Sequence, residues 1–165
     1  MDVKSCPSCG RPIPDHDRHV RFTLPDLVHE LPEREYTAGT WMEHTNARDA
    51  DMMQVPNVGA FVRALIPIRL TEGHQITYGV WLAINPAQLR GLFDLWHKPE
   101  YGDLKLDGWL ANSIQPWGLL AAPVRAVVRD TDHTPYCDSS TDDMLDAVLH
   151  RVWPHDTVLS AHRSS

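Results

Sequence analysis

The stretch that decides the fold is residues 62–84, VRALIPIRLTEGHQITYGVWLAI. Apolar side chains alternate along two limbs that flank Glu72 and Gly73. The side chains that share a face are Val62, Ala64, Ile66, Ile68 and Leu70 in the first limb, and Tyr78, Val80, Leu82 and Ile84 in the second. A period of two is typical of strands that bury one face. The stretch therefore predicts a hairpin, and with it an antiparallel sheet.

Capping signals and helical spacing predict two amphipathic helices. Asn85 and Pro86 have the chemistry of an N-cap and of a first helical position. The apolar residues that follow at helical spacing are Leu89, Leu92, Phe93 and Trp96. Ser140 and Asp143 predict the start of the second helix, near the C-terminus. Its apolar stripe consists of Met144, Leu145, Val148, Leu149 and Val152.

Further alternating stretches predict strands at residues 106–114 and 122–129, with shorter strands at 19–23 and 51–55. Together these elements predict an α+β fold. We expect an antiparallel sheet of about five strands, mostly in meander order, with the two amphipathic helices on one face.

The chain of 165 residues is long enough for one domain with its own core. We expect residues 18–159 to form it, with an arm at 1–17 and a frayed tail at 160–165. Fifteen basic against 22 acidic side chains give a formal net charge of −7, which argues against a nucleic-acid partner. No apolar run approaches the ~18 residues of a membrane span, and the N-terminus has no signal-peptide core. We therefore expect a cytoplasmic protein without a membrane partner.

The N-terminal arm contains a pair of cysteines, Cys6 and Cys9, followed by Gly10. Two thiolates at this spacing can converge on one zinc ion, so the arm predicts a zinc knuckle. A closed zinc site needs two more ligands. The candidates are His16 and His19, or His133 and Cys137 brought in by folding. The alternatives are a degenerate knuckle with free thiols and, less favoured, a redox pair at the two cysteines.

A ligand groove is the second candidate site. Trp81 falls on the face of the hairpin opposite to the apolar set, beside the small residues Gly79 and Ala83. Arg63 would border such a groove, and Trp109 and Asn112 lie in the next predicted strand. The favoured alternative is that the segment 18–57 packs on this face and that Trp81 belongs to the core.

The order and spacing of several phrases resemble a bacterial family known as domain of unknown function 2199. The phrases are Cys6 to Gly10; Phe61 to Arg63 leading to Ile66 to Ile68; Tyr78 to Leu82; Gly108 to Asn112; and Asp132 and His133 with Pro135. The resemblance covers nearly the whole chain. It implies one domain and a prokaryotic intracellular protein, and it implies no activity.

These features favour a non-enzymatic binding or interaction module, for a protein or small-molecule partner, with a possible structural zinc knuckle. The alternative is an enzyme that acts on a small molecule in the groove around Trp81. Asp132 and His133 could form an acid/base pair, but neighbouring strand residues face opposite ways and no nucleophile accompanies them. We therefore expect binding rather than catalysis.

Overall fold

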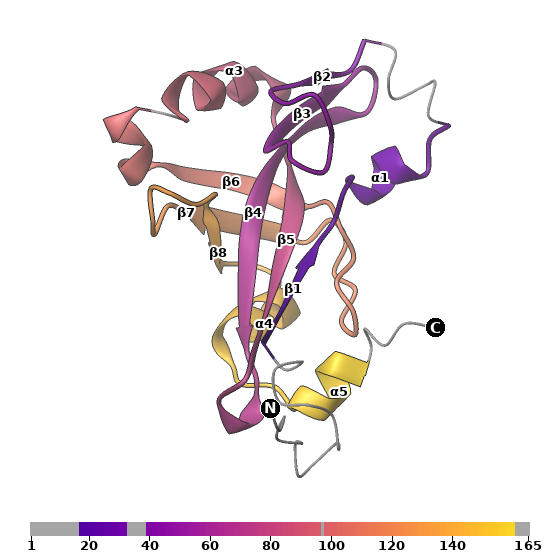
Figure 1. The fold of residues 1–165 in the computed structure, drawn as a ribbon, viewed down its shortest axis with the longest axis vertical. Coiled ribbons are helices and arrows are strands. Elements are labelled where there is room, and N and C mark those ends of the chain that lie inside the picture. Colours follow the sequence, from indigo (N-terminus) through magenta and orange to yellow (C-terminus); the bar gives the residue numbers. More distant parts are fainter. Residues whose placement is uncertain (1–16, 33–38, 97, 161–165) are drawn as a thin grey trace, which may run out of the picture.

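The computed structural model describes residues 17–32, 39–96 and 98–160, drawn in colour in Figure 1. The strands are β1 (Asp17–Arg21), β2 (Trp41–Met42), β3 (Met52–Val55), β4 (Gly59–Arg69), β5 (Gln75–Ile84), β6 (Lys105–Leu110), β7 (Pro123–Val127) and β8 (Tyr136–Ser139). The helices are α1 (Asp26–His29), α3 (Pro86–Leu95), α4 (Asp143–His150) and α5 (His155–Ser160), with 3-10 turns η2 (Thr71–Gly73) and η3 (Pro99–Asp103).

The predicted hairpin is confirmed as β4 and β5. The two strands pair antiparallel from Ala60 opposite Ile84 to Arg69 opposite Gln75. Glu72 and Gly73 turn the chain with φ angles of 61° and 76°, in the left-handed region that Gly tolerates best. Every apolar residue of the predicted inward set is buried in one cluster. The alternation of apolar residues therefore located both the strands and their core face.

The predicted open antiparallel meander is wrong, because the sheet is a closed, mixed barrel. The strand order is β1-β5-β6-β7-β8-β4-β3-β2, and β5 also pairs with β4, which closes β4 to β8 into a five-stranded barrel. Two of the pairings are parallel: β8 with β4 at Tyr136 and Leu65, and β1 with β5. Closure gives the edges of the central strands a partner. The alternation of apolar residues predicts strands, but it does not predict which strand pairs with which.

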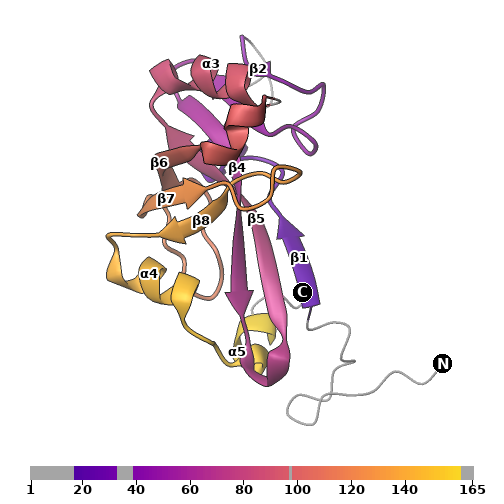
Figure 2. The ribbon, with the colours of Figure 1, turned by 90° about the vertical axis from the view of Figure 1, so that its left-hand side faces the viewer.

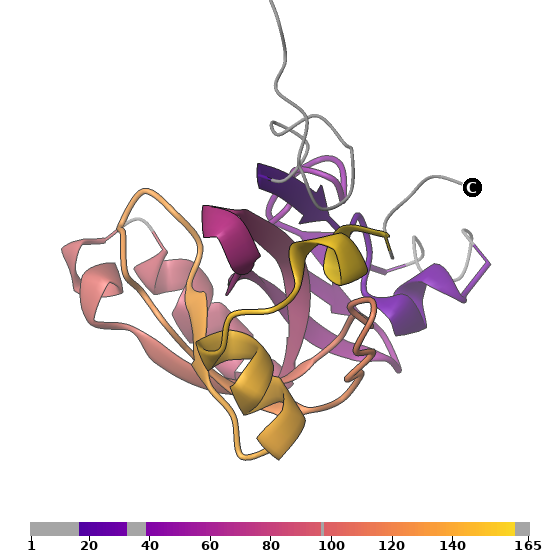
Figure 3. The ribbon, with the colours of Figure 1, turned by 90° about the horizontal axis from the view of Figure 1, so that it is seen from below.

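The predicted placement of both helices on one face of the sheet is also wrong. Figures 1 and 2 show α3 above the short strands β6 to β8 and α4 below them. Seen from below in Figure 3, α4 and α5 lie at the lower end of the molecule. The buried side chains are Leu89 and Leu92 in α3 and Leu145 and Val148 in α4. The helices therefore pack at opposite ends of the barrel, because each end exposes apolar side chains of the interior.

The helix caps are partly as predicted. Asn85 caps α3, since its side chain accepts a hydrogen bond from the backbone N–H of Ala87 at 3.0 Å. The cap of α4 is Asp142 rather than Ser140, because Asp142 Oδ1 accepts from the N–H of Leu145 at 2.9 Å. Both residue types are good N-caps, and the local sequence offers several of them.

The outer face of the hairpin carries a second core. The N-terminal segments cover it, and the buried residues of this cluster are Val28, Ala50, Met53, Val55, Phe61, Trp81 and Ala111. This arrangement is the alternative in which the segment 18–57 packs over Trp81. The predicted arm and tail lie almost wholly outside the described residues, which begin at Asp17 and end at Ser160. Among the described helices, none is long and apolar enough to cross a membrane.

Candidate functional site

Arg63 and Trp81 lie together in the second core, and the polar atoms of both side chains form hydrogen bonds within the protein. Arg63 is 1% exposed, and its guanidinium stacks on the Trp81 ring, 4.0 Å from the ring centroid. Its N–H groups donate to backbone carbonyl oxygens of Phe22, Thr23, Ala47, Arg48 and Ala50. Burial, followed by the charge of Arg21, lowers the pKa of Arg63 to about 9, so the group stays charged at pH 7. The carbonyl oxygens supply the partners that a buried cation needs.

Asn112 has a similar structural role. Its Oδ1 accepts from the backbone N–H of Trp81 at 2.8 Å. Its Nδ2 donates to the carbonyl of Leu24 and to Asp26 Oδ1, both at 2.9 Å. Asn112 is fully buried, and these bonds join the end of β6 to β5 and to the start of α1. Polar atoms used in this way are not available to a ligand.

Trp109 lies elsewhere, so the four residues predicted for one groove do not line a common surface. Along β6 the side chains alternate, with Leu106, Gly108 and Leu110 buried and Trp109 pointing outward, 51% exposed. Trp109 borders a groove of about 460 Å³ on the outside of the barrel. The groove is lined by Asp107, Gly108, Trp109, Pro123, Val124, Arg125, Ser139, Ser140 and Thr141. We call this surface the Trp109 groove.

The register of β6 and β7 positions the floor of the Trp109 groove. Trp109 pairs with Pro123, and Asp107 pairs with Arg125. A Cβ atom on Gly108 would lie 2.7 Å from the carbonyl oxygen of Ala83, so only glycine lets β6 run this close to β5. The glycine at this inward position therefore keeps the strand in the register that turns Trp109 outward.

The charges of the groove balance each other. Arg125 Nε donates to Asp107 Oδ1 at 2.9 Å, and Nη2 donates to Oδ2 at 3.3 Å. The hydrogen bond from Arg125 lowers the pKa of Asp107, which is ionised at neutral pH. Both side chains are more than half exposed, so the pair adds little to stability. It presents instead a planar, neutral hydrogen-bonding edge beside the indole.

The wall of the groove is fixed by Ser140. Its hydroxyl donates to the carbonyl of Pro123 and accepts from the N–H of Asp142 at 2.9 Å. These bonds tie the loop before α4 to β7. The hydroxyl proton is thus donated to a backbone carbonyl rather than to a base, which is the setting of a structural serine rather than of an activated nucleophile.

The metal candidates lie in different places. Cys6, Cys9 and His16 fall outside the described residues. His19 on β1 and His133 are exposed, whereas Cys137 is buried in the barrel core. Burial raises the pKa of the Cys137 thiol to about 12, which disfavours the thiolate that zinc binds. Within residues 17–32, 39–96 and 98–160, no group of three or more His, Cys, Asp or Glu side chains could hold a metal ion.

His133 pairs with a different carboxylate from the one that the sequence suggested. Its Nδ1 lies 3.0 Å from Asp130 Oδ2, whereas Asp132 donates its backbone N–H to Asp130 at 2.9 Å. Asp130 and His133 are three residues apart, and this spacing within a turn is the sequence signal that could have identified the pair. Sequence reasoning also missed the residues that complete the Trp109 groove on β7 and before α4, because they come from separate parts of the chain.

The family comparison matches residues 5–148 to a model described as an uncharacterised protein conserved in bacteria, DUF2199. The chain belongs to this family. The resemblance found in the sequence is thereby confirmed. The DUF2199 match includes all the strands of the barrel and ends within α4. Searches of curated proteins and of solved structures found no significant match.

Proposed function

We propose that this DUF2199 protein is a non-enzymatic binding module that holds a peptide segment of a partner protein in the Trp109 groove. One observation carries the proposal: Trp109 on β6 is half exposed at the edge of a groove of about 460 Å³. Exposed aromatic surface is unfavourable in water, and free energy is gained when a partner covers that surface.

The composition of the groove favours a peptide. Trp and Arg are the residue types that most often dominate protein interfaces, and both Trp109 and Arg125 are present here. The Asp107–Arg125 pair leaves the groove neutral, and the neighbouring Ser and Thr hydroxyls can bond to a peptide backbone. A ring-bearing side chain of the partner would pack against the Trp109 indole and Pro123.

The alternative of a small-molecule enzyme at Arg63, Trp81, Trp109 and Asn112 has less support. Three of these residues already bind backbone groups, and Trp109 lies on a different surface. The hydroxyl of Ser140 in the Trp109 groove donates to the carbonyl of Pro123 rather than to a base. We therefore favour binding.

The test is a selection from a displayed random-peptide library on the immobilised full chain, followed by calorimetry with the enriched peptide. Trp109→Ala is expected to weaken binding by about tenfold or more, as for a hot-spot residue. Trp41→Ala is the matched control, because Trp41 is also an exposed Trp, on β2 away from the groove. No enrichment, or equal affinity in Trp109→Ala, would contradict the proposal.

We also propose that Cys6 and Cys9 bind zinc, in a cytoplasmic protein that keeps its thiols reduced. This proposal is separate from the peptide groove. It is supported by the Cys-x-x-Cys spacing and the glycine after it. Elemental analysis after chelator-free purification should find about one zinc per chain, lost in Cys6→Ser. Wild-type protein without stoichiometric metal would rule the knuckle out.

A further inference from the structure

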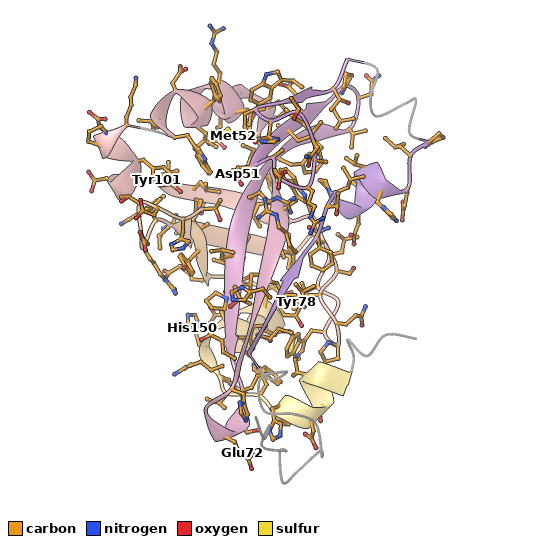
Figure 4. All side chains as sticks on the ribbon, in the orientation of Figure 1. Asp51, Met52, Glu72, Tyr78, Tyr101 and His150 are labelled. Carbon is orange, nitrogen blue, oxygen red and sulfur yellow. The ribbon has the colours of Figure 1, made fainter. Side chains whose placement is uncertain are left out.

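A second cavity is separate from the Trp109 groove and shares none of its lining residues. It has a volume of about 310 Å³ and lies between Asp51 before β3, Trp96 at the end of α3, Tyr101 on η3 and the turn at residues 131–134. Figure 4 shows Asp51 beside the upper part of β4 and Tyr101 farther from that strand. The cavity thus collects side chains from four separated segments of the chain.

Asp51 is the polar group at the inner wall. Its side chain is 29% exposed, and Oδ1 lies 3.6 Å from Arg21 Nη2. Burial raises the pKa of Asp51, and the charge of Glu43 raises it further. These effects outweigh Arg21, Arg63 and the hydrogen bond from Trp96, all of which lower it. Because burial is the main cause of the shift, a cationic ligand close to Asp51 would stabilise its carboxylate form.

The charged neighbours of Asp51 are also bonded to backbone groups. Arg21 Nε donates to the carbonyl of Arg48 at 2.8 Å. Glu43 Oε1 accepts from the backbone N–H groups of Asp51 and Met52. The guanidinium of Arg63 is bonded to the carbonyl oxygens described above. A cationic ligand in the cavity would add a positive charge beside Asp51.

The outer wall is equally well fixed. The Tyr101 hydroxyl donates to the carbonyl of His133 at 2.6 Å, which anchors the turn to η3. The rings of Trp96 and Tyr101 lie with centroids 5.0 Å apart, and both side chains are at least nine-tenths buried. Asp132 adds a second carboxylate to the lining. The cavity therefore joins two carboxylates with aromatic rings.

We propose that this cavity binds a small organic cation through a primary ammonium group, seated between Asp51 and Asp132 beside the rings of Trp96 and Tyr101. An ammonium group has three donors and no acceptor, which suits carboxylate oxygens. Aromatic faces attract cations at short range. The net charge of −7 also favours the approach of a cation. This site is independent of the Trp109 groove.

The experiment is an NMR titration of the full, isotope-labelled chain with putrescine, using 1,4-butanediol as the uncharged analogue of the same length. Putrescine should shift the Trp96 indole N–H, which bonds to Asp51, and the backbone amides of residues 131–134. Butanediol at the same concentration should leave them in place. These resonances differ from those of Trp109, so the outcome is separate from that of the peptide proposal.

Variants test the roles of the two carboxylates. Asp51→Asn keeps an oxygen that can accept from Trp96 but removes the charge, and should weaken putrescine binding by about tenfold. Asp94→Asn removes an exposed carboxylate of α3 outside the cavity and should leave the affinity unchanged. If Asp51→Asn fails to fold, the exposed Asp132→Asn serves instead, with an expected loss of about threefold.

Three results would overturn the proposal. One is the absence of shifts with putrescine, and another is an equal response to butanediol. The third is an affinity for putrescine that neither Asp51→Asn nor Asp132→Asn reduces.

Discussion

Arg63 and Trp81 stand directly opposite each other in the β4–β5 register, with the guanidinium carbon 4.0 Å from the centre of the indole ring. Because Arg63 also bonds to carbonyl oxygens of residues 22, 23, 47, 48 and 50, one side chain links the hairpin to both N-terminal segments. The pair therefore stabilises the outer core rather than lining a binding site.

Arg63→Lys tests this role. A lysine has only three donors, all on one atom, so several buried carbonyl oxygens lose their partners, and it has no planar group to stack on the indole face. We expect the free energy of unfolding to fall by about 2–4 kcal/mol, measured by denaturant titration. Arg90→Lys, at an exposed position on α3, should change it by less than about 0.5 kcal/mol. Equal effects of the two substitutions would show that Arg63 is not a structural centre.

Gly108→Ala tests the close approach of β6 to β5. The new methyl group would meet the Ala83 carbonyl oxygen at 2.7 Å, and the strand would have to move. We expect a loss of about 1–3 kcal/mol in the free energy of unfolding. Gly91→Ala is the control, because nothing lies within 4 Å of its Cβ position in α3, and it should raise stability by about 0.5–1 kcal/mol. A neutral Gly108→Ala would mean that β6 is not held in this register.

The sequence predicted the features that depend on neighbouring residues. Alternation over residues 62–84 located the hairpin and its buried face, and Asn85 located the start of α3. It could not predict closure, since Leu65 and Tyr136 pair across a long stretch of chain by backbone bonds that any residue can form. The sequence also could not predict that Trp109 is exposed, because its exposure depends on which face of β6 lines the barrel.

Cys137 should be chemically inert in the folded protein. Its side chain is 2% exposed, and burial raises the pKa of the thiol to about 12, so little thiolate forms at pH 8. In a Cys6→Ser, Cys9→Ser variant, a thiol reagent should label Cys137 only after denaturant is added. Rapid labelling under native conditions would show that the barrel core opens at β8.

Asp51 should make stability depend on pH with a defined sign. Its pKa is raised by burial and by Glu43, against the opposing charges of Arg21 and Arg63. The folded state therefore binds this proton more tightly than the unfolded state, and stability falls as the pH rises above the ordinary value of 3.8. In Asp51→Asn this contribution is absent, so the variant should gain stability relative to the wild type as the pH rises from 3 to 7. A difference that stays constant or falls over that range would contradict the environment described for Asp51.

The most direct test of the central claim, that the Trp109 groove is the binding surface, is an NMR titration with the library-selected peptide. The Trp109 indole N–H and the amides of residues 107–109, 124–125 and 139–141 should shift together, while the buried Trp81 indole, bonded to the carbonyl of Thr23, should not. Shifts that gather on another surface, such as the pocket between Trp41 and Phe93, would contradict the account.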